Sequence, residues 1–351
     1  MHKPEVQKAD EARRTPDTGD HRPRHPDFVL DPGAVAAIEK WMKRLGWEAG
    51  GRLISVERAG NGNMNMTVRV RTADWSFILK QARPWVVKYP QIPAPLERAG
   101  VEAAFYAAVG GVAEVSRRMP RLRGFDAESH LLWLEDMGEG GDLTHLFQTG
   151  EFTAEECAEL IRYLVTLHRV KVTAGEAAVF QNRAMRALNH EHQYEFPLRA
   201  ENGLDLERIT PGLAQEAGRL QRDEKYCERV AELGRLYLAD GAVLVHGDYF
   251  PGSWLRREGG LAVIDPEFCF LGMAEYDLGV FLAHLELMGA GCHGARVREA
   301  YGEGVDWRLA RAFAGTELMR RLIGVAQLPL AAGMAAKRGW LELSREWVCA
   351  L

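Results

Sequence analysis

The chain has 351 residues, of which 47% are hydrophobic and 26% are charged, and its formal net charge is -5. This length exceeds what one compact core usually holds, so two lobes or domains are expected, and the composition is that of a water-soluble globular protein. The negative charge gives no bulk electrostatic reason to bind nucleic acid or an anionic membrane, and neither is expected as a partner.

The five cysteines are scattered, odd in number and never arranged as a C-x-x-C pair. This distribution argues against a disulfide framework or a zinc cage and fits a reducing compartment. No segment approaches the roughly 20 apolar residues that cross a bilayer. The first residues also lack the apolar stretch of a signal peptide. The expected localisation is therefore cytoplasmic.

The N-terminal part is predicted to consist of a tail, a helix and a small sheet. Residues 1–26 are crowded with Pro, His and charge and lack apolar periodicity, which predicts a disordered tail. From Pro32 onward apolar residues recur at helical spacing. Strand-like runs follow at residues 53–56, 66–70 and 77–79. We expect these runs to form an antiparallel meander.

Later segments complete an α+β pattern. A helix is predicted from about Pro95 to Val109, and an apolar strand at 131–134 follows it. Two long stretches of helical periodicity come next, at 153–169 and 212–239. Two short apolar strands interrupt the helical part at 243–245 and 261–264, and we interpret them as a small hairpin of adjacent strands.

These two short strands each deliver acidic residues at their ends. His246-Gly247-Asp248 follows the first, Ser253 comes five residues after Asp248, and Asp265-Pro266-Glu267 follows the second. Residues two apart on an extended strand face the same way, so Asp265 and Glu267 could present oxygens to one Mg²⁺ ion. Asp248 could accept the proton of an incoming hydroxyl. Any one of these acids could be an ordinary turn residue, but the ordered set argues for a site.

His246-Gly247-Asp248 and Ile264-Asp265 resemble the catalytic and metal segments of the aminoglycoside phosphotransferase and choline kinase superfamily, which has a two-lobed protein-kinase-like fold. Gly252-Ser253 and Asp265-Pro266-Glu267-Phe268 are similar to methylthioribose kinase. The resemblance implies that Asp248 is the catalytic base and that Asp265 and Glu267 hold the metal. Ser253 stands where most relatives have a metal-binding Asn, and it either binds the metal weakly or braces the loop. His246 and Asp277 would support the catalytic loop.

The same superfamily requires a nucleotide site in the first lobe. Gly60, Gly62, Asn63 and Asn65 lie in a reversal whose backbone N–H groups could approach phosphates, although a plain hairpin turn has the same composition. Lys80 ends an apolar strand, from which its ammonium could reach the α- and β-phosphates. Glu102 is the expected partner of Lys80, with Glu97 as the competing choice.

The resemblance further implies a hinge and a substrate end. Glu135-Asp136-Met137 would form the hinge that recognises adenine and divides the chain into lobes at 27–137 and 138–351, although a strand ending in a turn predicts the same residues. Arg320 and Arg321 resemble the twin arginines near the sugar of methylthioribose kinase, although a basic helix face or a structural pair with Glu317 remains an alternative. Two departures concern the acceptor: Phe250-Pro251 replaces the usual His-Thr pair, and residues 170–240 are hard to align.

The expected function is transfer of the ATP γ-phosphate, with Mg²⁺, to a hydroxyl of a small molecule, first of all a methylthioribose-like sugar. The alternatives are an aminoglycoside, another sugar or an amino alcohol as acceptor, a catalytically inactive nucleotide-binding regulator, or a metal-dependent hydrolase. A homodimer is a possible assembly.

Overall fold

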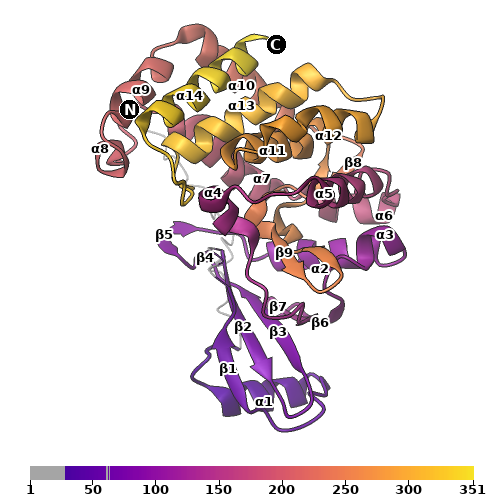
Figure 1. The fold of residues 1–351 in the computed structure, drawn as a ribbon. Helices are drawn as coiled ribbons and strands as arrows, with labels where there is room; N and C mark the ends of the chain where they lie inside the picture. Colours follow the sequence, from indigo (N-terminus) through magenta and orange to yellow (C-terminus); the bar gives the residue numbers. More distant parts are fainter. Residues whose placement is uncertain (1–27, 61, 63) are drawn as a thin grey trace, which may run out of the picture.

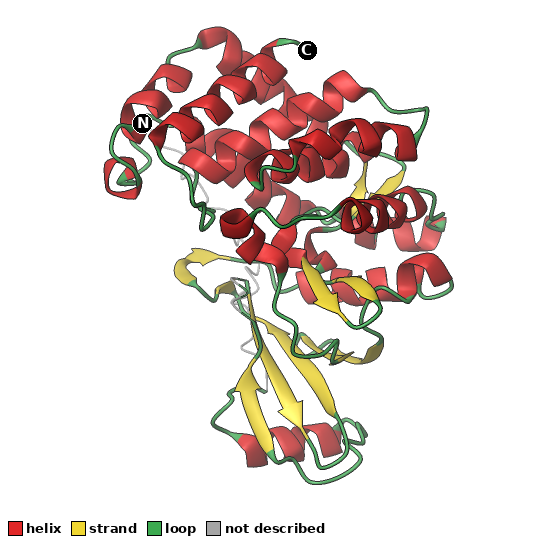
Figure 2. Ribbon diagram, in the orientation of Figure 1, coloured by secondary structure: helices red, strands yellow, loops and turns green. Residues whose placement is uncertain are grey.

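The computed structural model describes residues 28–60, 62 and 64–351, so the tail predicted over residues 1–26 lies outside the described part. Figures 1 and 2 show one lobe in which strands predominate and a larger lobe made mainly of helices. The predicted α+β class and two-lobed architecture are confirmed.

The first lobe is built on a five-stranded antiparallel sheet in the order β1-β2-β3-β7-β6. Its strands are β1 (Ser55–Arg58), β2 (Asn65–Arg71), β3 (Ser76–Ala82), β6 (Leu122–Asp126) and β7 (Leu131–Glu135). The predicted meander corresponds to β1, β2 and β3. Strand β6 and a hairpin formed by β4 (Trp85–Val86) and β5 (Tyr89–Pro93) were not predicted from the sequence.

Two helices cover the two faces of this sheet, because successive residues of a strand point to opposite sides. One face packs with Ile38 and Met42 of α1 (Val35–Arg44). The sheet residues on that face are Val68, Val70, Phe77, Leu79, Leu131 and Trp133. Leu132 and Leu134 point the other way and share a core with Phe105 of α2 (Arg98–Val109). Helix α2 thereby lies between the sheet and the second lobe (Figure 1).

The second lobe is mainly helical, and α11 and α13 pack closely along each other and beside α14. The helices outside the sheet domain are α3 (Ala113–Ser116), α4 (Leu146–Thr149), α5 (Ala154–Leu167), α6 (Ala174–Ala177), α7 (Arg183–His190), α8 (Leu206–Ile209), α9 (Leu213–Gln221), α10 (Glu224–Leu238), α11 (Ala274–Leu287), α12 (Gly294–Tyr301), α13 (Trp307–Ile323) and α14 (Met334–Cys349).

Capping residues decide where two of the predicted helices begin. The helix predicted over 153–169 is α5, which starts at a capping box formed by Thr153 and Glu156. The helical periodicity predicted over 212–239 is confirmed, but it belongs to two helices, α9 and α10. They are separated at Arg222 and Asp223, where the Asp223 carboxylate accepts a hydrogen bond from the backbone N–H of Tyr226 and caps α10.

The predicted hairpin between the apolar strands at 243–245 and 261–264 is wrong. The first strand, β8 (Val243–Val245), pairs with β11 (Phe270–Gly272). The second, β10 (Gly260–Val263), pairs with β9 (Trp254–Arg257) in a separate two-stranded sheet. The two acidic loops therefore come together through their own contacts rather than through a shared strand ladder.

Among the described residues, no helix is long and apolar enough to cross a membrane.

Candidate active site

The backbone of the loop that carries Asp248 is fixed by a glycine and by a buried carboxylate. Gly247 has a positive φ of 87°, and a Cβ atom there would lie 2.1 Å from the carbonyl oxygen of Phe268, so only glycine fits. The fully buried carboxylate of Asp277 accepts hydrogen bonds from the backbone N–H groups of His246 (2.6 Å) and Gly247 (3.0 Å). Asp277 thus lies where the loop-supporting role predicted for it requires.

Two further contacts connect this loop to its surroundings. His246 Nε2 donates to the carbonyl oxygen of Ile264 at 3.0 Å, which ties the Asp248 loop to the residue just before Asp265. Ser253 is buried in the short 3-10 helix η5 (Pro251–Ser253), and its Oγ donates to the carbonyl oxygen of Asp248 at 2.9 Å. Of the two roles predicted for Ser253, this contact favours bracing the loop.

The Asp248 side chain is 25% exposed and lies beside both predicted substrate arginines. Its Oδ1 is 3.3 Å from Nη2 of Arg321 and 3.5 Å from Nη2 of Arg320. Burial raises the pKa of Asp248 above its ordinary value, and the two guanidinium groups oppose that rise. Tertiary structure therefore brings Arg320 and Arg321, over 70 residues away in sequence, to the predicted catalytic acid.

Glu317 holds both arginines in place from within α13. Its fully buried carboxylate accepts from Nε of Arg320 (2.7 Å), from Nε of Arg321 (2.7 Å) and from Nε2 of His284 (2.9 Å). Burial would raise the pKa of Glu317, but the two arginines hold it well below its usual range. Burial lowers the pKa of His284 to about 4, so this imidazole is neutral near pH 7 and donates from Nε2. Arg320 and Arg321 are thus paired with Glu317 and, at the same time, lie beside Asp248.

Lys80 of β3 is the centre of a second charged group, on the nucleotide side. Its Nζ lies 2.6 Å from Oε2 of Glu102 on α2 and 2.8 Å from Oδ1 of Asp265. Glu102, not Glu97, is therefore the helical partner. Burial would lower the pKa of Lys80, but the carboxylates of Asp265, Glu102 and Glu267 outweigh it and raise that pKa. Burial raises the pKa of Glu102 to about 7, although the ammonium group acts against it.

Asp265 and Glu267 were predicted to lie two apart on one extended strand, and this prediction is wrong. Asp265 has a left-handed conformation with φ of 62°, and Glu267 lies in the 3-10 helix η6 (Pro266–Phe268). The Asp265 side chain is 41% exposed, whereas that of Glu267 is 6% exposed and pairs with Arg98 of α2 at 3.0 Å. The two acids are therefore in different environments.

Three of the four residues predicted to cover phosphates are described. Gly60 and Gly62 lie in the β1–β2 reversal, and an added Cβ at either would meet no atom within 4 Å. Asn65 is instead buried, and its Nδ2 donates to Oε2 of Glu267 at 2.9 Å. Asn63 lies outside the described residues. Among these three described residues, the two glycines have unfilled space beside them and Asn65 does not.

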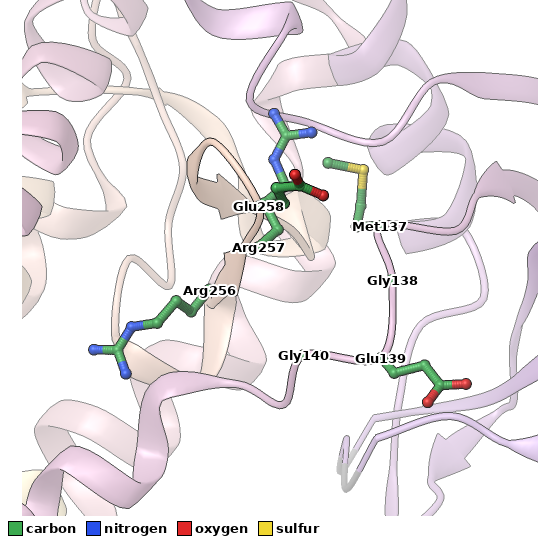
Figure 3. Close-up of a pocket in the computed structure, with 7 residues that line it drawn as sticks. All are labelled: Met137, Gly138, Glu139, Gly140, Arg256, Arg257 and Glu258. Carbon is green, nitrogen blue, oxygen red and sulfur yellow. The ribbon is translucent and has the colours of Figure 1, made fainter.

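The predicted hinge residues follow β7, at the junction of the lobes. Glu135 ends β7, and its Oε2 accepts from the backbone N–H of Arg121 at 3.2 Å. Met137 helps to line an open cavity of about 450 Å³ together with the turn between β9 and β10 (Figure 3). The cavity residues are Met137, Gly138, Glu139, Gly140, Arg256, Arg257 and Glu258. The Arg256 side chain points away from this cavity and pairs with Glu156.

No role was predicted for Arg98 from the sequence. Glu317 was predicted only as an alternative structural partner of Arg320 and Arg321. Helical spacing carried a signal for both. Arg98 lies one turn before Glu102, and Glu317 lies three and four residues before Arg320 and Arg321, so each is on the same helix face as a predicted site residue.

The described part of the chain contains no group of three or more His, Cys, Asp or Glu side chains placed to hold a metal. Asp265 and Glu267 instead face cationic side chains of the first lobe. The donor set still has the right chemistry for Mg²⁺, because carboxylate oxygens are its usual protein ligands and it takes the rest from water and phosphates.

Two solved structures that are similar to this chain are small-molecule phosphotransferases. The spectinomycin phosphotransferase APH(9)-Ia, solved with ADP and spectinomycin, superimposes with a TM-score of 0.51 at 12% identity, covering 88% of this chain and 97% of that one. Choline kinase LicA from Streptococcus pneumoniae gives a TM-score of 0.50 at 13% identity, covering 90% and 99%. At these identities the likeness shows the fold, which is the two-lobed protein-kinase-like fold.

The chain belongs to the phosphotransferase enzyme family, whose profile matches residues 55–314. Methylthioribose kinase from Exiguobacterium sibiricum is 28% identical over 264 residues, covering 71% of this chain and 64% of that protein. Methylthioribose kinase from Erwinia tasmaniensis is 25% identical over 350 residues, covering 84% and 86%. The match to the first of these relatives thus spans less than two thirds of its length.

Proposed function

We propose that this protein is an ATP- and Mg²⁺-dependent kinase that phosphorylates a hydroxyl group of a small molecule, with a methylthioribose-like sugar as the first candidate acceptor. The observation that carries the proposal is the connection of two charged groups. The hydrogen bond from His246 to Ile264 joins the loop of Asp248, beside its two arginines, to the loop of Asp265, beside Lys80. Such a kinase needs an acceptor site and a phosphate site that meet in this way.

On the nucleotide side, Lys80 would hold the ATP phosphates, fixed in direction by Glu102. The backbone around Gly60, Gly62 and Asn63 would approach the phosphates, and the hinge at Glu135 and Met137 would recognise adenine. Asp265 and Glu267 would hold Mg²⁺, which when bound neutralises charge on the phosphates. Asp265 has the more exposed carboxylate of the two and would leave Lys80 to do so.

On the acceptor side, Asp248 would accept a hydrogen bond from the reacting hydroxyl and orient its oxygen toward the γ-phosphorus. As the oxygen–phosphorus bond forms, the bond from phosphorus to the β,γ-bridging oxygen breaks, and the hydroxyl proton passes to the Asp248 carboxylate. Ser253 and Asp277 would keep the loop from moving during this step. Catalysis here is mostly positioning and electrostatics.

The charges around Asp248 favour an uncharged acceptor rich in hydroxyl groups. The positive charges of Arg320 and Arg321 are balanced by the carboxylates of Glu317 and Asp248, so the group has no net charge. The Arg321 guanidinium also lies over the ring of Phe250 at 4.4 Å. A group without net charge offers a cationic aminoglycoside no electrostatic attraction.

An acceptor screen tests the proposed function. Purified protein with ATP and Mg²⁺ should release ADP when methylthioribose is added, and less or none with aminoglycosides, choline or other sugars. Release driven by one of those other acceptors would keep the kinase and change its substrate. Tight ATP binding without transfer to any acceptor would favour a regulator, and phosphate release without acceptor would favour a hydrolase.

The raised pKa of Asp248 predicts the acidic side of the pH profile. The catalytic form is the carboxylate, so kcat/KM should fall as pH is lowered through this pKa, at a pH above the ordinary value of 3.8. Steady-state kinetics between pH 4 and 8, with circular dichroism to confirm that the protein stays folded, measures this fall. The midpoint should move in Asp248→Glu, and an unchanged midpoint there would assign the fall to another group.

A further inference from the structure

Arg98, the first residue of α2, has a fully buried side chain that joins several parts of the proposed nucleotide site. Its guanidinium donates to four acceptor atoms and pairs with a carboxylate. The acceptors are Asn65 Oδ1 (3.0 Å) and the carbonyl oxygens of Met64 (3.1 Å), Arg83 (2.9 Å) and Pro95 (2.5 Å), and the ion pair joins Nε to Oε2 of Glu267 at 3.0 Å. A planar guanidinium fork can satisfy this many acceptors at once, whereas an ammonium cannot.

These acceptors come from separate segments around one point. Met64 and Asn65 follow the glycine-rich reversal, Arg83 follows β3, and Glu267 belongs to the second lobe. Asn65 closes a triangle, because its amide donates to the same Oε2 of Glu267 at 2.9 Å. Arg98 therefore contacts both Glu267 and the start of β2, the strand that follows the glycine-rich reversal (called the phosphate-loop strand below).

Asp265 and Glu267 consequently differ in the partners and the exposure of their carboxylates. Oε2 of Glu267 pairs with Arg98 and accepts a hydrogen bond from Asn65, and among the described residues no donor to its Oε1 is found. Within the described part of the chain, the Asp265 carboxylate pairs with Lys80, and its side chain is 41% exposed. To bind a metal, Asp265 would exchange Lys80 for it, whereas Glu267 would use Oε1, for which no donor is found among the described residues.

We propose that Arg98 is a positioning residue for metal and nucleotide binding. It fixes Glu267 as a stationary, one-oxygen ligand joined to the phosphate-loop strand and leaves Asp265 as the acid that exchanges Lys80 for the metal. The part of this inference that concerns turnover rests on the proposed function. The part that concerns binding does not, because it can be measured without an acceptor.

The test compares Arg98→Lys, Arg98→Met, Glu267→Gln and the double variant Arg98→Met/Glu267→Gln with the full-length protein. Binding of Mn²⁺ in the presence of ADP is followed by electron paramagnetic resonance, and the melting temperature is measured without ligands. We expect Arg98→Lys, which keeps the charge but loses the fork, to weaken Mn²⁺ binding about tenfold, the loss typical of a residue that orients a metal ligand.

Arg98→Met should lower the melting temperature by several degrees, because it leaves Glu267 buried without its cation. The double variant should recover much of that loss, since it removes both charges, yet its Mn²⁺ affinity should stay low. Lys337→Met is the matched control: Lys337 is a buried cation of α14 that bonds Thr210, so its loss should lower the melting temperature without changing Mn²⁺ binding.

Unchanged Mn²⁺ affinity in Arg98→Lys, which keeps Glu267 as a possible ligand, would overturn the proposal and make Arg98 a purely structural residue. If Arg98→Met does not fold, Arg98→Lys still decides the question. Weakened Mn²⁺ binding in Arg98→Lys, together with no turnover of any acceptor by the unaltered protein, would support the role of Arg98 and reject the proposed function.

Discussion

Asp248→Asn should lower kcat by roughly 10²- to 10⁴-fold, the usual contribution of a positioned acid or base, and leave the KM for ATP nearly unchanged. The amide cannot take the hydroxyl proton, but it keeps the shape of the side chain. Ser253 and Asp277 bind only the backbone of this loop, so its conformation should persist. Steady-state kinetics with the acceptor found in the screen measures the loss.

Asp240→Asn is the matched control for this substitution. Asp240 lies eight residues upstream, and its side chain is half-exposed and pairs with Arg183 and Arg186. Asp240 pairs with neither the proposed catalytic acid nor its arginines, so turnover should be close to that of the unaltered protein although the pair with buried Arg186 is lost. A folded Asp248→Asn variant with near-normal turnover would contradict the proposed mechanism.

Lys80→Met is expected to lower kcat/KM for ATP by roughly 10²- to 10³-fold, which is the cost of losing one preorganised charge contact to the reacting group. The variant also leaves Glu102 buried without its ammonium partner, and breaking a buried pair costs about 3–5 kcal/mol of stability. Kinetics with varied ATP and chemical denaturation at several pH values measure the two effects. Lys171→Met, at an exposed lysine after α5, should change neither.

The stability of Lys80→Met should depend on pH with a defined sign. The pKa of Glu102 is already raised to about 7 with Lys80 present, and losing the ammonium raises it further. Between the ordinary value of 4.5 and the raised pKa, the native state holds a proton that the unfolded state has lost, so the free energy of unfolding falls as pH rises through that window. Stability that rose with pH there would contradict this assignment.

Local pattern was sufficient for the elements whose signal lies in neighbouring residues. The β1-β2-β3 meander follows from apolar runs separated by Gly and Asn, and α5 follows from its periodicity after Thr153. The hairpin β4–β5 was missed because β4 has two residues and β5 contains Pro90 and Pro93, which mask strand periodicity. The break between α9 and α10 depends on a cap at Asp223 that a long helical period hides.

The pairing of β8 and β10 could not be predicted for a different reason. Each is an apolar run of three or four residues, and such a run does not specify its partner. Nearness in the chain suggested one hairpin, whereas each strand pairs with another segment. The acids at their ends approach through His246 and Ile264, a contact that only the packed structure creates.

By itself the sequence determined the order of the parts: an acid after a short strand, a second acidic loop, a lysine on the third strand and paired arginines near the end. Motifs of this kind are local, so residue types and spacing suffice to find them. The tertiary structure decided which charge faces which. Arg98 pairs with Glu267 across about 170 residues, and Glu317 turns the two arginines toward Asp248. A buried ion is stable only where the whole fold supplies its partner, and no short window of sequence contains that information.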